Sequence, residues 1–118
     1  MRVALLEDDQ DQAALFTEWL KAAGHTCEHF DAGKSFVRNI KHDSYDALIL
    51  DWMVPDMDGF EVLRWVRENF DWPIPVVFVT ARDDEDDIVR ALGQGADDYV
   101  VKPAKQRELV ARLTAVVR

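Results

Sequence analysis

The sequence has one cysteine in 118 residues, Cys27, so no disulfide can form within the chain. A lone cysteine is typical of a reducing compartment, and we expect a cytoplasmic protein in which Cys27 is a small apolar residue of a strand. Long apolar runs are absent as well: none approaches the length of a membrane span, and the N-terminus has no secretory signal pattern. We therefore expect no association with a membrane.

Basic residues are few, with 14 Lys and Arg against 23 Asp and Glu and a formal net charge of −9. Such an excess of negative charge repels the phosphates of nucleic acids, so we expect no direct nucleic-acid binding by this domain. The acids form two clusters. The cluster at residues 83–87 is interpreted as a solvated helix start, whereas the cluster at residues 7–11 directly follows an apolar strand.

About half of the residues are apolar (48%), and the length suits one domain spanning residues 1–118. Short apolar runs alternate with amphipathic stretches. The expected strands are Val3–Leu6, Thr26–Phe30, Ala47–Leu50, Pro75–Val79 and Tyr99–Val101, and the expected helices are Asp9–Ala23, Ala32–Lys41, Phe60–Asn69, Asp84–Leu92 and Lys105–Val117. Strict alternation of this kind predicts an α/β fold with a parallel sheet covered by helices on both faces. We expect the flavodoxin-like (βα)5 three-layer sandwich with strand order 2-1-3-4-5, which would bring the first and third strands side by side.

Polar residues stand at the carboxyl ends of the expected strands. Glu7 and Asp8 follow the first strand, Asp51 the third, Thr80 the fourth and Lys102 the fifth. Parallel strands bring these ends to one edge of the sheet, where open α/β sheets bind their ligands. Three carboxylates so close together need a cation, and oxygen ligands in a partly open site suit Mg²⁺. A carboxylate can also attack phosphorus to form an acyl phosphate, with a lysine and a hydroxyl holding the transferred oxygens.

Four stretches of the chain resemble response-regulator receiver domains of two-component signalling. They are Leu5–Asp9 (LLEDD), Leu48–Gly59 (LILDWMVPDMDG), Val79–Arg82 (VTAR) and Gly95–Pro103 (GADDYVVKP). They occur in the family's order, and the resemblance covers the whole chain. It is nearest to the receivers of winged-helix transcriptional regulators.

The resemblance implies a role for each matching residue. Asp51 is the phosphoacceptor, Lys102 binds the phosphoryl group, and Thr80 and Tyr99 are the switch residues. Mg²⁺ is held by Asp8, by Asp51 and by the backbone carbonyl of Met53, with Glu7 acting through water. The Lys102–Pro103 peptide bond is expected to be cis. Before helix Phe60–Asn69, Gly59 is expected to allow a positive φ and a close backbone approach.

The resemblance also implies the partners and the output. The partner is a histidine kinase or phosphotransfer protein, and the output face is built from the fourth helix, the fifth strand and the fifth helix. Its expected residues are Val89, Leu92, Asp98, Ala111 and Arg112, with an ion pair between Asp98 and Arg112. Other positions depart from the family pattern, namely Ile88, Gly93, Ala104 and Thr114. We therefore expect a monomer or a weak homodimer through this face.

The expected activity is a phosphorylation switch and not an enzyme, beyond catalysing its own phosphorylation and a slow loss of the phosphoryl group. Slow hydrolysis is expected because Met53 and Arg82, near the acceptor, offer no amide or carboxylate to position water. Two contexts stay open. The chain is either the receiver of a transcriptional regulator whose C-terminal effector domain lies outside this sequence, or a stand-alone or hybrid-kinase receiver.

Three other classes are disfavoured by particular residues. A haloacid-dehalogenase-type phosphatase needs a second aspartate two positions after the nucleophile, where this chain has Met53. A flavodoxin-like FMN carrier needs a phosphate-binding first loop, whereas residues 7–11 are acidic and repel phosphate. A receiver-like module without phosphorylation would lack one of the site residues, and none is missing.

Overall fold

The strands form one parallel sheet of order β2-β1-β3-β4-β5, as predicted. The structure, a computed structural model, describes all residues from 1 to 118. The strands are β1 (Arg2–Leu6), β2 (Thr26–Phe30), β3 (Ala47–Leu50), β4 (Val76–Thr80) and β5 (Asp98–Val101). The inner strands β3 and β4 are buried along their whole length, which explains their continuous apolar runs. No residue of the edge strand β2 is fully buried, and its apolar pattern is correspondingly weak.

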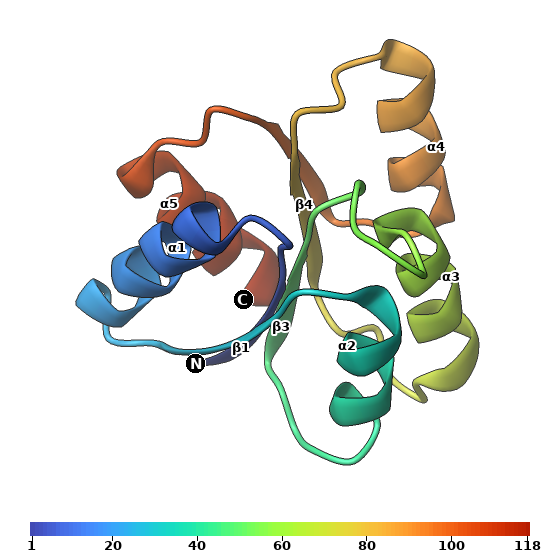
Figure 1. Ribbon diagram of the computed structural model, residues 1–118, viewed down its shortest axis with the longest axis horizontal. Helices are drawn as coiled ribbons and strands as arrows, with labels where there is room; N and C mark the ends of the chain where they lie inside the picture. The colour runs from blue at the N-terminus through green and yellow to red at the C-terminus, as the bar shows by residue number, and fades with distance from the viewer.

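Five helices cover the two faces of the sheet and complete the three layers (Figure 1). They are α1 (Gln10–Ala22), α2 (Gly33–Ile40), α3 (Gly59–Asn69), α4 (Glu85–Gln94) and α5 (Gln106–Val117). Helices α1 and α5 lie together on one face, and α2, α3 and α4 lie on the other. The architecture is therefore the flavodoxin-like (βα)5 sandwich that the sequence predicted.

The helix ends follow from capping side chains and glycines. Asp9 caps α1 by accepting from the Gln12 backbone N–H at 3.0 Å. Asp58 and Glu61 form a reciprocal capping box at the start of α3, with distances of 2.9 and 3.2 Å. Helix α4 ends at Gly95, whose φ of 116° is left-handed. The prediction that α4 ends at residue 92 was therefore short by two residues.

Strand β4 begins at Val76 and not at Pro75, because proline has no N–H to donate to the ladder. The Pro75 carbonyl still accepts from the Leu48 backbone N–H at 2.9 Å, so the chain enters the sheet at this residue. β4 then extends to Thr80, one residue beyond the predicted end. This extension places the Thr80 backbone inside the sheet, which fixes its side chain at the edge.

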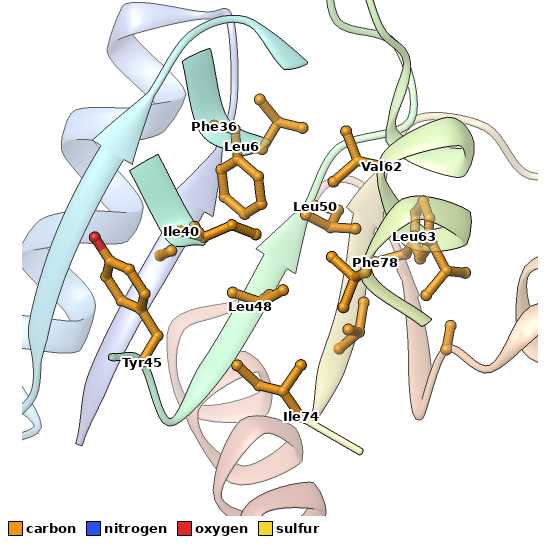
Figure 2. Close-up of a cluster of buried hydrophobic side chains, with 14 of the residues drawn as sticks. Leu6, Phe36, Ile40, Tyr45, Leu48, Leu50, Val62, Leu63, Ile74 and Phe78 are labelled. Carbon is orange, nitrogen blue, oxygen red and sulfur yellow. The ribbon is translucent and has the colours of Figure 1, made fainter. Parts of the chain in front are cut away.

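The core is divided by the sheet into two apolar clusters. Figure 2 shows the cluster between the sheet and helices α2 and α3, where Leu48, Leu50 and Phe78 from the strands meet Phe36 and Leu63 from the helices. The second cluster lies under α1 and α5. Burial of these side chains fixes the strand positions, and with them the residues that follow each strand. None of the helices combines the length and apolar composition that crossing a membrane requires.

Candidate functional site

Three carboxylates converge at the carboxyl edge of the sheet, as the strand order predicts. Glu7 follows β1 and is 1% exposed, and Asp51 follows β3 and is 6% exposed. The Asp51 backbone N–H donates to the Leu6 carbonyl at 3.0 Å, so pairing of β1 with β3 continues up to Asp51. Asp8 is exposed beside them. One carboxylate oxygen from each of the three lies within 4.8 Å of the others.

The Lys102 ammonium lies between two of these carboxylates. Its Nζ is 2.6 Å from Glu7 Oε1 and 2.9 Å from Asp51 Oδ2. Strand β5 delivers the side chain to this point, and the Lys102 backbone N–H donates to the Thr80 carbonyl at 2.8 Å. The Lys102–Pro103 peptide bond is cis.

Burial and pairing together set the charges of this group. Burial raises the pKa of Glu7, and the hydrogen bond from Lys102 opposes that rise. For Lys102, burial alone would lower the pKa, but the hydrogen bonds to Glu7 and Asp51 outweigh it and the pKa is raised. Lys102 therefore stays a cation. A single ammonium does not balance three carboxylates, which leaves net negative charge at the site.

Thr80 and Tyr99 meet at the backbone of Arg82. Thr80 is fully buried, and its Oγ1 accepts from the Arg82 N–H at 3.4 Å. The Tyr99 ring stacks on Phe78 with centroids 5.6 Å apart, and its hydroxyl donates to the Arg82 carbonyl at 2.7 Å. Burial, reinforced by the charge of Asp87, raises the pKa of Tyr99 to about 12. The two residues expected to act as the switch are thus linked through one peptide segment.

The prediction that the acidic cluster at residues 83–87 is solvated was wrong for Asp87. Asp87 is 8% exposed, and its Oδ2 accepts from Arg82 Nε at 2.9 Å. The guanidinium of Arg82 in turn lies 4.6 Å from the centre of the Trp52 ring. Asp87 precedes the buried Ala91 by one helical turn, and this spacing was the signal in the sequence that it faces inward.

Gly59 was expected to have a positive φ and a close backbone approach, and only the close approach is present. Its φ is not in the left-handed region, and the loop's positive φ of 63° belongs to Asp56 instead. The close approach is present, because a Cβ on Gly59 would lie 2.2 Å from the Asp51 backbone oxygen. Glycine is needed here for space and not for backbone conformation.

The residues expected on the output face gather around α4, β5 and α5. Val89 and Leu92 are 61% and 44% exposed on α4, and Ala111 is exposed on α5. Arg112 Nη1 pairs with Asp98 Oδ2 at 3.1 Å, within the chain. Arg112 Nε also bonds Glu108 Oε1 at 3.1 Å, so the guanidinium already has two carboxylate partners.

The donor set at the sheet edge fits a hard divalent cation. Carboxylate oxygens from Glu7, Asp8 and Asp51 converge, and one side of the cluster is open through the exposed Asp8. Mg²⁺ prefers such oxygen ligands and keeps several waters, which an open site allows. Met53 lies beside the group, and its backbone N–H donates to Asp51 Oδ1 at 3.2 Å.

Comparison with known proteins shows the family to which the chain is similar. The model of the response regulator receiver domain matches residues 3–114. Curated relatives include the transcriptional regulatory proteins HprR of Escherichia coli (strain K12) and TcrA of Mycobacterium tuberculosis (strain ATCC 25618 / H37Rv), each 39% identical over 118 residues. The alignments cover the whole chain but only 52% and 46% of those proteins, so the chain spans about half the length of its curated relatives.

Solved structures agree with the sequence match. The receiver domain of Francisella response regulator 1452 superposes with a TM-score of 0.92 at 28% identity, covering 98% of this chain and 95% of that one. The receiver domain of a signal transduction histidine kinase from Syntrophus aciditrophicus gives 0.89 at 32% identity, covering 98% and 89%. With its sheet order, its acidic sheet edge and the family match over nearly its whole length, the chain belongs to the response regulator receiver domains.

Proposed function

We propose that this chain is a phosphorylation switch that takes a phosphoryl group on Asp51 from a histidine kinase or phosphotransfer protein, in the cytoplasm. The observation that carries the proposal is the position of the Asp51 carboxylate. It is almost buried, lies next to two further carboxylates, and has the Lys102 ammonium at 2.9 Å. This combination provides a nucleophile, a set of oxygen ligands and a cation for the transferred oxygens.

In the proposed reaction an Asp51 carboxylate oxygen attacks the phosphorus of a phosphohistidine. The new P–O bond forms as the P–N bond breaks, and the electron pair leaves with the imidazole nitrogen. Lys102 holds one phosphoryl oxygen, and the Thr80 hydroxyl donates to another. Asp8, Asp51 and the Met53 carbonyl would hold Mg²⁺, with Glu7 acting through water. The bound ion would supply positive charge beside the attacking and transferred oxygens.

The transferred oxygens would also change the pairing of Lys102. This ammonium now bridges Glu7 and Asp51, and a phosphoryl group on Asp51 offers it a more highly charged partner. Movement of the Thr80 hydroxyl toward the phosphoryl group would then act on the Arg82 backbone, to which Tyr99 is also bonded. The phosphoryl group thereby biases an equilibrium between two arrangements of α4 and β5.

The proposed output is control of transcription through an effector domain outside this sequence. The curated relatives are named as transcriptional regulatory proteins and are about twice as long as this chain. The alternative is a receiver that acts by protein–protein contact, as a stand-alone chain or as part of a hybrid kinase. The similarity at 32% identity to the receiver domain of a histidine kinase supports this second context.

The test is covalent labelling with a small phosphodonor. The chain is incubated with acetyl phosphate and Mg²⁺, and its intact mass is compared with that of Asp51→Asn. We expect one added phosphoryl group in the parent chain, none in Asp51→Asn and none when EDTA removes the metal. Equal labelling of Asp51→Asn would refute the assignment of the acceptor, and labelling that persists in EDTA would refute the requirement for the metal.

A further inference from the structure

The loop between β3 and α3, residues 51–58, is anchored at its tip to the first turn of α2. The Gly33 backbone N–H donates to the Pro55 carbonyl at 3.3 Å, and the Lys34 N–H donates to Asp56 Oδ1 at 3.0 Å. A Cβ on Gly33 would lie 1.9 Å from the Met57 carbonyl oxygen. Three successive loop residues therefore contact one helical turn at van der Waals or hydrogen-bond distance.

Asp56 supplies the one side-chain hydrogen bond of this anchor. Ala32, the residue immediately before α2, has no side chain able to cap the helix, so the Asp56 carboxylate takes that role from a distant loop. To do so, Asp56 adopts a φ of 63°, a left-handed conformation that costs free energy for any residue except glycine. Among the non-glycine residues it is the only one with a positive φ.

The two ends of the loop are joined at Trp52 and Gly59, which form its neck. The Gly59 N–H donates to the Trp52 carbonyl at 2.9 Å, and Gly59 packs directly on the Asp51 backbone. Residues 53–57 are thus held at two points, the neck beside the acceptor and the tip on α2. Helix α2 is itself fixed to the sheet by the buried side chains of Phe36 and Ile40. The position of the Met53 backbone is set between these two fixed points.

We infer that Asp56 is a positioning residue for the metal site: by capping α2 it holds the loop so that the Met53 carbonyl faces the carboxylates of Asp8 and Asp51. This inference rests on the proposed function, because only that function gives the Met53 carbonyl a ligand. It accounts for a strained aspartate at a place where glycine would relieve the strain. Glycine at this position would keep the backbone and lose the cap.

Three variants of Asp56 separate the cap from the backbone conformation. Asp56→Asn keeps a side-chain oxygen and tolerates a positive φ, Asp56→Gly tolerates the φ without a cap, and Asp56→Ala provides neither. The matched control is Asp31→Ala, which removes an exposed acid near the same helix start that does not cap it. Each variant is titrated with Mg²⁺ by isothermal titration calorimetry, and its thermal midpoint is measured without metal.

We expect Asp56→Gly and Asp56→Ala to bind Mg²⁺ about tenfold more weakly, at the lower end of the 10–100-fold loss seen when groups that orient metal ligands are removed. Asp56→Asn should restore affinity to near the parent value, and Asp31→Ala should match the parent. In metal-free protein, amide exchange at Lys34 should accelerate in the glycine and alanine variants only. Asp56→Gly is the decisive variant, because glycine accommodates the positive φ of this position without strain.

Three results would overturn the inference. Parent-like Mg²⁺ affinity in Asp56→Gly, together with faster exchange at Lys34, would show that the cap serves stability alone. Unchanged exchange at Lys34 would show that the cap is not formed in solution. A parent chain that binds no Mg²⁺ would refute the proposed function itself, and this result differs from the first because it appears before any substitution.

Discussion

At the scale of single residues, Arg67 connects three segments that are distant in sequence. From the last turn of α3 it donates to the Gly95 carbonyl at 2.7 and 3.1 Å and to the Ile74 carbonyl at 2.8 Å. It also pairs with Asp97 at 3.2 Å, whose carboxylate accepts from the Val76 N–H. Its side chain is 19% exposed, so these bonds are largely shielded from water.

Replacing Arg67 by Met should lower the free energy of unfolding by about 2–4 kcal/mol. Hydrogen bonds to charged groups contribute about 1.5–3 kcal/mol each. Without Arg67, the Gly95 and Ile74 carbonyls would be only partly hydrated. Arg64, one turn earlier on α3, is exposed, and Arg64→Met should change the free energy by no more than about 0.5 kcal/mol. Urea unfolding measures both variants. Equal effects of the two substitutions would mean that the Arg67 network contributes little.

Burial of Tyr99 predicts that the stability of the fold depends on pH at alkaline pH. Its pKa is raised from 10 to about 12, so folding favours the neutral phenol. The stabilisation is complete below pH 10 and is lost as the pH rises from 10 to 12. The chain has two tyrosines, so Tyr45→Phe leaves Tyr99 as the only one to titrate. Tyrosinate absorbance in that variant should have its midpoint near pH 12. A midpoint near pH 10 in folded protein would contradict the burial of the Tyr99 hydroxyl near Asp87.

The positions of Asp51 and Lys102 were predictable from the sequence, whereas the contacts of Asp56 and Arg67 were not. Asp51 and Lys102 follow apolar strands in a recognisable pattern, and the structure places them 2.9 Å apart. Asp56 gave no signal, because a strained backbone and a cap on a distant helix depend on how two loops meet. Arg67 likewise donates to backbone carbonyls. Every residue has such a carbonyl, so the sequence does not indicate which ones Arg67 contacts.

At the scale of elements, two helical glycines, Gly59 and Gly93, differ in the space available for a side chain. Gly59 begins α3 against the Asp51 backbone, where a Cβ would lie 2.2 Å from the carbonyl oxygen. Gly93 lies inside α4, and a Cβ there would meet nothing within 4 Å. Backbone atoms around Gly59 cannot rotate away, whereas the surface of α4 is open at Gly93.

Alanine at these two positions should therefore shift stability in opposite directions. Gly59→Ala should destabilise the chain by about 3 kcal/mol or more, at the upper end of the cost of overpacking. Gly93→Ala should stabilise it by about 0.5–1 kcal/mol, because alanine is the better helix former. Thermal melts of the two variants beside the parent check both signs. A lower midpoint for Gly93→Ala would show that α4 is not a regular helix at this point.

Element boundaries show what periodicity can and cannot predict. All ten elements were expected in the correct order, because apolar runs and amphipathic stretches alternate without exception. The ends shifted by one or two residues where backbone chemistry decides, as at Pro75 and at Gly95. Apolar periodicity reports burial, and burial does not determine which residue makes the last ladder bond.

At the scale of the whole molecule, the face formed by α4, β5 and α5 bears on the oligomeric state of the chain. Val89 and Leu92 are exposed, but Arg112 is already paired with Asp98 and Glu108 in the same chain. Exposed ion pairs contribute little, and this one would have to exchange partners to bridge two copies. We therefore expect the unphosphorylated chain to be a monomer or a weak dimer in sedimentation equilibrium. A tight dimer at micromolar concentration would contradict this expectation.

Of the three clustered acids Glu7, Asp8 and Asp51, we propose that Asp51 receives the phosphoryl group. The most direct measurement is reduction of the acetyl-phosphate-treated chain with borohydride, which converts an acyl phosphate to homoserine, followed by peptide mass spectrometry. We expect homoserine at position 51 alone, and none when Mg²⁺ is withheld. Homoserine at Asp8, or none anywhere despite bound Mg²⁺, would contradict it.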